Sequence, residues 1–311
     1  MECVLRLMFL ENVSEQDLQI YNGLELALTI PFNSSFPTLL QSMPIQNNTK
    51  TIAIMAILLV GVGATAVVAV QYLNATQAPP DDIIIPATLN VTLLENAGVM
   101  IETNDTRIYI DPIELNSTFT DYPADIVLVT HPHGDHYDPT SLDIIETEST
   151  EFIFPSNMTA ECAAYEATGV KPRDTIMIGD INITAFYMYT LPVDIYPASH
   201  PAEANWTSYI VTLDNFTLFH AGDSKNIIEY YELTGTIDLA FLPLGPGCQT
   251  MAGYEVVNTL ERIQPTYFIP IHYGDGVQDT WIASYGDDVE SETDCTAIVL
   301  EYWTMHTFEL E

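Results

Sequence analysis

Basic residues are nearly absent from this sequence. Only 7 of its 311 residues are Lys or Arg, against 43 Asp and Glu, so the formal net charge is −36 at pH 7. A protein that binds DNA or RNA needs basic side chains to neutralise phosphates, and docking on anionic lipid headgroups needs them as well. The composition therefore argues strongly against nucleic acid as a partner and against binding to an anionic lipid surface.

Cysteine is scarce as well. The four cysteines contain no Cys-x-x-Cys pair, so the sequence excludes a zinc knuckle built from paired thiolates. Three cysteines lie in the C-terminal part, where at most one disulfide can form, and the sequence leaves the pairing open.

Long hydrophobic runs are few, and one of them is long enough to cross a bilayer as a helix. Residues 51–73 carry no charge over 23 positions. Lys50 directly before the run predicts that the N-terminal side stays in the cytoplasm and that the C-terminal domain is extracellular, tethered to the membrane. A cleaved signal peptide and a buried core helix are the alternatives, and Gly61 and Gly63 weaken any helix here.

The chain divides into four parts on these patterns. Residues 1–50 are irregular. Met43 and the polar residues after it look like an ordinary export start, so two starts are open: Met1, or Met43 with residues 1–42 as a misassigned upstream extension. From about Asn90, short strands and helices alternate to the end, which predicts one α/β domain of two sheets flanked by helices. The predicted parts are an irregular segment (1–50), a transmembrane signal-anchor or signal peptide (51–73), a linker (74–86) and a folded domain (87–311). Helices in that domain are expected over residues 141–147, 158–167, 224–233 and 253–263.

The most informative stretch is His131-Pro-His-Gly-Asp-His136, which holds three of the seven histidines. It follows residues 125–130, a short branched apolar run typical of a buried strand. His131 and His133 are two positions apart, so in an extended segment they point the same way, and Gly134 permits a turn after which Asp135 and His136 reach a second point. Imidazole and carboxylate are good ligands for Zn²⁺ and, with more carboxylate, for Mn²⁺ or Fe²⁺. The stretch therefore predicts a metal site.

Three further candidate ligands lie near the ends of predicted strands. They are His200, Asp223 and His272. With the first loop they make five histidines and two aspartates that can converge on one site.

The pattern of these motifs resembles the metallo-β-lactamase superfamily. The resemblance rests on His131-x-His-x-Asp-His136, the distal His200, His-Ala-Gly-Asp223 and Pro-Ile-His272-Tyr-Gly. In pattern the chain is most similar to the ascorbate-6-phosphate-lactonase-like metal-dependent hydrolases, to which Asp238–Gly245 and Thr250-Met251 also bear a likeness. The match covers roughly residues 88–275 and implies a four-layer αβ/βα sandwich, with the site at one edge of the two sheets.

The resemblance implies a role for each candidate ligand. One metal ion would be held by His131, His133 and His200, and the other by Asp135, His136 and His272, with Asp223 bridging both. The implied enzyme is a dinuclear metal-dependent hydrolase, with Zn²⁺ expected first and Mn²⁺ or Fe²⁺ as alternatives. It would use a metal-bound hydroxide, and Asp135 would orient this hydroxide and pass a proton to the leaving group as the catalytic residue. Diiron flavoproteins of this fold usually carry a carboxylate where this chain has His133, so the histidine favours hydrolysis.

The expected substrate is a small molecule that carries little phosphate. The basic residues after position 80 are few, and none belongs to the ligand set: Arg107, Lys171, Arg173, Lys225 and Arg262. By resemblance, a lactone or an ester is the first expectation for the substrate. An amide, a small phosphodiester and a membrane lipid are the alternatives. A second hypothesis is a cell-surface structural or assembly protein that retains the fold, and assembly as a homo-oligomer is left open.

Overall fold

The computed structural model describes six stretches of the chain. These are residues 27–31, 54–59, 65–72, 88–192, 194–245 and 249–310. The chain divides into two compact units, Met1–Ile84 and Ile85–Glu311.

The N-terminal unit contains a small antiparallel sheet. Its strands are β1 (Ala27–Pro31), β2 (Ile54–Leu59) and β3 (Thr65–Tyr72), in the order β1-β3-β2. β2 and β3 pair from Ile54 opposite Tyr72 to Leu59 opposite Val67.

The prediction of a helix over residues 51–73 is therefore wrong for the two segments of this run that the structure describes. Both are strands, and the rest of the run lies outside the described residues. The physical reason is in the sequence: valine, isoleucine and threonine favour strands, and Gly61 and Gly63 fall between the two apolar halves. In the described part of the chain, no helix combines the length and apolarity needed to cross a membrane. The membrane tether remains a prediction from the sequence.

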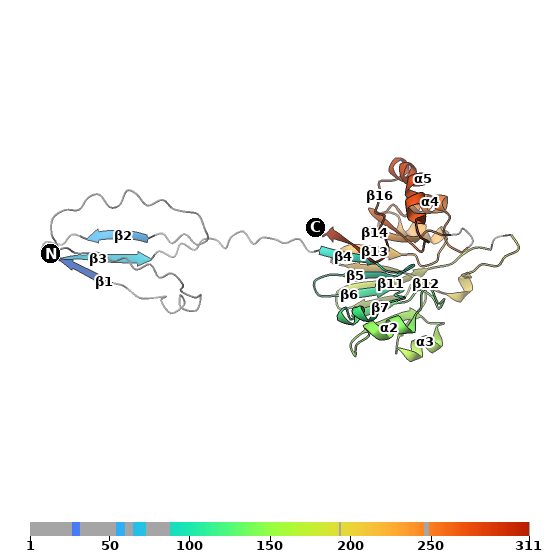
Figure 1. Cartoon of the computed structure of the whole chain (residues 1–311), viewed down its shortest axis with the longest axis horizontal. Helices are drawn as coiled ribbons and strands as arrows, with labels where there is room; N and C mark the ends of the chain where they lie inside the picture. Colours follow the sequence, from blue (N-terminus) through green and yellow to red (C-terminus); the bar gives the residue numbers. More distant parts are fainter. Residues whose placement is uncertain are drawn as a thin grey trace. The chain divides into compact units, whose positions relative to one another are not determined.

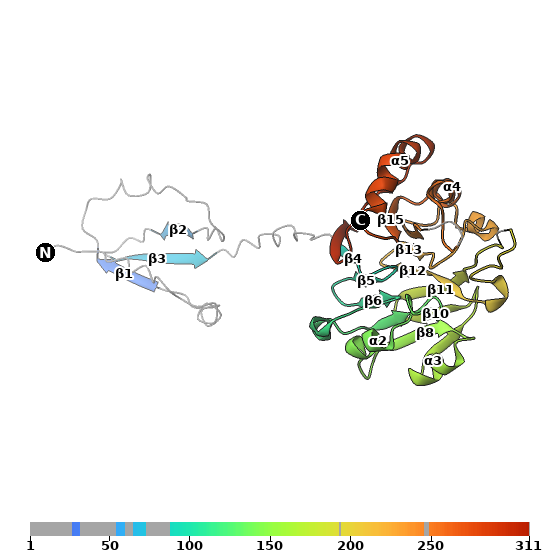
Figure 2. The same cartoon turned by 45° about the vertical axis from the view of Figure 1, so that its right-hand side comes forward.

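The C-terminal unit is built on two seven-stranded sheets (Figures 1 and 2). The first has the order β17-β4-β5-β6-β7-β8-β9: β17 (Thr304–Glu309), β4 (Thr88–Leu93), β5 (Val99–Glu102), β6 (Arg107–Ile110), β7 (Ile126–Leu128), β8 (Glu151–Pro155) and β9 (Thr168–Val170). The second follows chain order: β10 (Thr175–Ile178), β11 (Ile181–Tyr187), β12 (Thr207–Leu213), β13 (Phe216–His220), β14 (Leu239–Pro243), β15 (Tyr267–Ile271) and β16 (Thr296–Ala297).

Helices cover the outer faces of the two sheets, as Figure 1 shows. α2 (Pro139–Ile145) and α3 (Thr159–Ala164) lie on one side, and α4 (Gly253–Ile263) and α5 (Val277–Glu292) on the other. The described residues of this unit also include short 3₁₀ helices: η2 (Ser117–Asp121), η3 (Ala202–Ala204) and η4 (Ile228–Leu233). The order of layers is helix, sheet, sheet, helix, as the resemblance implies.

The centre of the first sheet is buried on both faces, whereas its edge strands β17 and β9 are largely exposed. In β7, Ile126 and Leu128 belong to the core between the sheets, whereas Val127 belongs to a second core under α2 that includes Leu142. A strand buried on both faces needs apolar residues at every position, which explains the uninterrupted apolar run before His131.

The same arrangement positions the loops that carry the candidate ligands. β6, β7 and β8 run parallel in one sheet, and β13, β14 and β15 run parallel in the other. The carboxyl ends of parallel strands lie at one edge of a sheet, where ligand sites form. The loops after β7, β13 and β15 therefore meet at this edge.

Candidate metal centre

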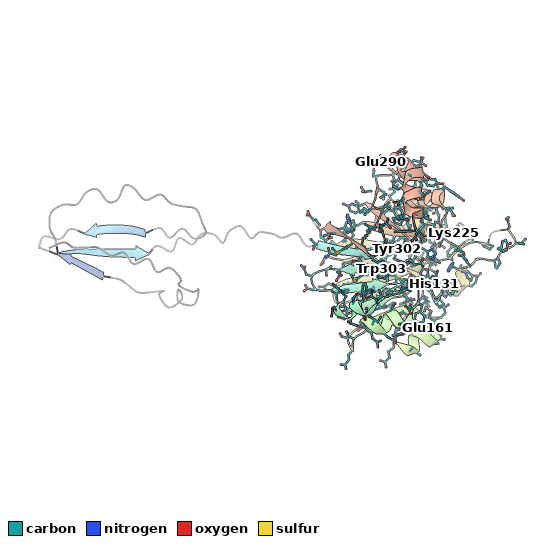
Figure 3. All side chains as sticks on the ribbon, in the orientation of Figure 1. His131, Glu161, Lys225, Glu290, Tyr302 and Trp303 are labelled. Atoms are coloured by element: carbon teal, nitrogen blue, oxygen red, sulfur yellow. The ribbon has the colours of Figure 1, made fainter. Side chains whose placement is uncertain are left out.

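All seven candidate ligands converge at the edge of the two sheets. Their ligand atoms form two groups, within each of which the atoms lie within 4.8 Å of one another: His131, His133 and His200, and Asp135, His136, Asp223 and His272. In Figure 3, His131 lies between the helical layers, whereas Glu161 and Glu290 project from the outer helices.

The three imidazoles of the first group present their ring nitrogens to one another. His131 Nε2 lies 3.0 Å from His133 Nδ1, and His200 Nε2 lies 3.3 and 3.2 Å from these two atoms. Three mutually adjacent nitrogens cannot all pair as donor and acceptor. Tetrahedral zinc with Zn–N bonds of about 2.0 Å separates its nitrogen ligands by about 3.3 Å, so this group fits one cation.

Asp223 joins the two groups. Its Oδ2 lies 3.4 Å from His200 Nε2 and 3.9 Å from His131 Nε2, whereas its Oδ1 lies 3.0 Å from His136 Nε2 and 3.4 Å from His272 Nε2. Each carboxylate oxygen thus faces a different set of imidazoles, which is the arrangement that a bridging ligand needs.

Three polar atoms of the second group are buried and have no hydrogen-bond partner. They are His136 Nε2, Asp223 Oδ1 and His272 Nε2. Leaving a buried polar atom unsatisfied costs about 1–3 kcal/mol, and a cation bound among these three atoms would remove that cost. The residues present therefore fit a metal ion.

The imidazoles carry different charges in the absence of a cation. Burial holds the pKa of His131 well below its usual value, and burial also lowers the pKa of His200 to about 4 although Asp223 opposes it. Burial disfavours the charged form of His136 too, but the carboxylates of Asp223 and Asp111 outweigh it and raise its pKa to about 10. His131 and His200 are thus neutral and ready to ligate, whereas a cation would replace the proton on His136.

The two carboxylates of the second group are ionised. The His272 imidazole, whose Nε2 lies 3.5 Å from Asp135 Oδ2, holds the pKa of Asp135 well below its usual range, against the effect of burial. Burial would raise the pKa of Asp223, but the imidazoles around it, His136 first among them, lower it overall. Both side chains therefore offer negative oxygens at neutral pH.

Asp111 contacts the candidate ligand His136 and the neighbouring residue Thr130. It was not predicted from the sequence. Its fully buried carboxylate lies 2.8 Å from His136 Nδ1 and accepts hydrogen bonds from Thr130 N at 2.7 Å and Thr130 Oγ1 at 2.6 Å. Thr130 Oγ1 in turn lies 3.0 Å from His131 Nδ1. Such contacts fix which ring nitrogen faces the metal and orient the ring. In the sequence, the Asp111-Pro112 pair at the end of a predicted strand was the available signal.

Trp206 is a second residue that sequence reasoning missed. Its ring centroid lies 5.3, 5.1 and 5.5 Å from the ring centroids of His131, His133 and His200. The indole therefore forms a wall against the first group, and its buried Nε1 has no hydrogen-bond partner.

Three further residues, none of them a candidate ligand, have structural contacts. His220 lies 2.8 Å from the carbonyl oxygen of Ala97, which ties β13 to the β4–β5 turn. Tyr273 stacks on Tyr302 with ring centroids 4.7 Å apart and donates a hydrogen bond to the Leu300 carbonyl. His306 packs against Phe308 on β17. Among the cysteines of the described residues, Cys162 and Cys295 are free thiols.

The sequence is similar to a known family of domains and to several known proteins. A family model described as Beta-lactamase superfamily domain matches residues 90–272. The chain is 31% identical over 208 residues to a UPF0173 metal-dependent hydrolase of Pyrococcus furiosus, covering 62% of this chain and 86% of that protein. It is 27% identical over 201 residues to the UPF0173 metal-dependent hydrolase YtkL of Bacillus subtilis, covering 60% and 86% respectively.

Solved structures show the same fold. A protein of Parabacteroides distasonis classed as a metal-dependent hydrolase is 27% identical, with a TM-score of 0.59, and the alignment covers 70% of this chain and 94% of that one. Igni18, a metallo hydrolase of Ignicoccus hospitalis, is 19% identical with a TM-score of 0.58, covering 72% and 100%, and so shows the fold alone. Together with the ligand cluster, these relatives identify a metal-dependent hydrolase and weigh against the hypothesis of a purely structural protein. The chain belongs to the metallo-β-lactamase superfamily.

Proposed function

We propose that this protein is a dinuclear metal-dependent hydrolase that cleaves a small uncharged lactone or ester. The observation that carries the proposal is the orientation of Asp223, whose two carboxylate oxygens face different groups of imidazoles. In this proposal His131, His133 and His200 hold one cation, and Asp135, His136 and His272 hold the other, with Asp223 shared. Two divalent cations bound there would activate water near neutral pH and polarise the substrate's carbonyl oxygen.

Asp135 is the residue that we assign to proton transfer. Its side chain is 53% exposed, whereas that of Asp223 is 4% exposed, so Asp135 is accessible to water and substrate. Its Oδ2 lies 3.5 Å from His272 Nε2, and the lowered pKa keeps it ionised. Asp135 would accept a proton from the attacking water and return it to the leaving group.

The positions of the basic residues support an uncharged substrate. Among the described residues, Arg107, Arg173 and Lys225 form ion pairs of 2.6–2.7 Å with Glu102, Glu232 and Glu255 respectively. Arg262 donates to the Ile227 carbonyl at 2.7 Å and stacks on Tyr231. These four cations are engaged by their own neighbours, and none of the five Lys and Arg in residues 88–310 is among the candidate ligands. Recognition of a phosphate-rich substrate normally uses such groups.

Metal analysis and a substrate panel test this function. The full chain loaded with Zn²⁺ or Mn²⁺ is expected to bind about two ions per chain and to hydrolyse lactones or esters faster than phosphodiesters or β-lactams. His133→Ala should abolish turnover and reduce metal content, whereas His306→Ala, outside the cluster, should change neither. A chain that binds no metal, or a His133→Ala variant with full turnover, would contradict the proposal.

A further inference from the structure

A pocket of about 330 Å³ lies between the end of β14 and the starts of α4 and α5. Gly245 lines this pocket, and a Cβ atom added to Gly245 would stand 3.6 Å from His272 Nδ1. Gly245 therefore connects the pocket to the Nδ1 side of His272, whereas Nε2 of the same ring faces Asp135 and Asp223. Pockets that hold small molecules have volumes of about 300–1,000 Å³, so this one suits part of a small substrate.

Aromatic side chains of α5 form a fixed wall of the pocket. Trp281 Nε1 donates a hydrogen bond to the Gly253 carbonyl at 3.0 Å, and the Trp281 and Tyr285 rings stack with centroids 6.0 Å apart. A Cβ atom on Gly253 would lie 2.5 Å from Tyr285 Cε2 and 3.0 Å from Trp281 Cδ1. Glycine at this position therefore lets the two rings close against the start of α4.

The rest of the lining is apolar or uncharged apart from one carboxylate. Leu244 and Val277 add aliphatic surface, Thr280 and Ser284 add hydroxyls one turn apart on α5, and Asp275 is the single charged residue among those that line the pocket. Such a lining favours an apolar group and repels an anion.

A buried hydroxyl packs behind Gly245. Thr250 is fully buried, and its Oγ1 has no hydrogen-bond partner. A Cβ atom on Gly245 would collide with this oxygen, so the close packing needs glycine here, and Thr250 itself lies outside the residues that line the pocket.

We propose that this pocket is the subsite for the uncharged alkyl or aromatic group of the ester or lactone, and that it selects such groups over carboxylated ones. The proposal rests on the proposed hydrolase function, because it places the scissile carbonyl at the metal ligands and the apolar substituent beside His272. α5, which supplies Val277, Thr280 and Trp281, follows residue 272, where the family match ends. Specificity would thus come from a helix outside the matched region.

Binding of two fluorinated probes to the full chain tests the subsite independently of turnover. Fluorine NMR would measure saturable binding of methyl 4-fluorobenzoate and of 4-(methoxycarbonyl)-2-fluorobenzoate, which carries a carboxylate on the ring opposite the ester, with and without chelator. The neutral ester should bind, and the carboxylate should bind about tenfold more weakly because of Asp275 (1.4 kcal/mol). Thr280→Trp, which fills the pocket from an exposed position, should abolish ester binding. Ala283→Trp adds the same bulk to α5 outside the lining and should leave binding unchanged. Asp275→Asn should bring the two probes closer in affinity.

The outcomes separate the subsite from the chemistry. The subsite proposal is overturned if the ester shows no saturable binding, if Thr280→Trp and Ala283→Trp behave alike, or if the carboxylate binds as tightly as the ester. If the probes behave as expected but the metal-loaded chain hydrolyses no ester or lactone, the subsite stands and the proposed reaction fails. With active enzyme, Thr280→Trp should reduce kcat/KM for benzoate esters about tenfold more than for acetate esters.

Discussion

The two oxygens of Asp223 face different groups of imidazoles, and in the proposed dinuclear centre this side chain is the ligand that both ions share. Asp223→Ala removes the shared ligand, and the remaining imidazoles lose the negative charge between them. We expect metal content to fall from about two ions to one or fewer and hydrolysis to fall by about a hundredfold or more. Metal analysis and steady-state kinetics measure this. Asp180→Ala, in an exposed turn, is the matched control. Two ions and full turnover in Asp223→Ala would refute the bridging assignment.

Asn96 connects two candidate ligands that are far apart in the sequence. Its carbonyl accepts a hydrogen bond from His272 N at 2.8 Å, and its Nδ2 donates to the Asp135 carbonyl at 2.9 Å. Asn96 also has a φ of 57°, which asparagine and glycine tolerate. Asn96→Gly keeps the backbone carbonyl that accepts the hydrogen bond from His272 N and removes only the side-chain amide. The Asp135 carbonyl then loses its hydrogen bond from Asn96 Nδ2.

We expect Asn96→Gly to weaken metal binding at Asp135, His136 and His272 about tenfold and to leave the other group unchanged. A two-step chelator competition titration resolves the two affinities. Asn215→Gly provides the control, because Asn215 also has positive φ (64°) but lies in the β12–β13 turn. An equal loss at both groups, or none at either, would show that Asn96 does not position Asp135.

At the scale of elements, a buried ion pair fixes the start of α4. Lys225 Nζ lies 2.7 Å from Glu255 Oε2, and the same oxygen accepts a hydrogen bond from Ala252 N at 2.8 Å. The Lys225 side chain is only 7% exposed. Glu255→Ala would remove one partner of this buried ammonium group. We expect the free energy of unfolding to fall by about 3 kcal/mol. Urea denaturation measures this change in the free energy of unfolding. The control is Glu261→Ala, which removes an exposed carboxylate from the same helix and should stay within about 0.5 kcal/mol of wild type. If Glu255→Ala also changed the free energy of unfolding by no more than about 0.5 kcal/mol, the ion pair would not hold α4 in place.

The sequence predicted some elements well and others poorly, for reasons visible in their side chains. α4 has the predicted bounds, because it carries a clear periodic pattern. Of the predicted helix 224–233, only η4, a 3₁₀ helix over Ile228–Leu233, forms. α5 was not predicted, because Asp and Glu dominate its second half. Its buried positions Gln278, Trp281 and Val289 do follow helical spacing, but they are too sparse for a strong signal.

At the scale of the whole molecule, metal binding should stabilise the fold. A ligand at a thousandfold excess over its Kd stabilises the native state by about 4 kcal/mol, because the unfolded chain cannot assemble ligands from four separate loops. For a domain of this size that corresponds to roughly 10 °C in Tm. Calorimetry with and without chelator should show this decrease in Tm for the wild type and a smaller decrease for Asp223→Ala. Equal decreases in the two proteins would place the stabilising metal elsewhere.

The sequence by itself determined the ligand types and the fold family. His131 to His136 lie within six residues, and a buried strand before them fixes where they point. His200, Asp223 and His272 could be selected because they follow strands and belong to a motif pattern.

Only the tertiary structure decided what surrounds these ligands. Asp111, Trp206 and Asn96 act through contacts with residues up to 176 positions away in the chain, as in the bond from His272 N to Asn96 O, and no local pattern encodes such contacts. The pocket beside His272 likewise exists only because α5 packs against the start of α4. Local periodicity reports which face of an element is buried, whereas the partner that buries it is set by the packing of the whole domain.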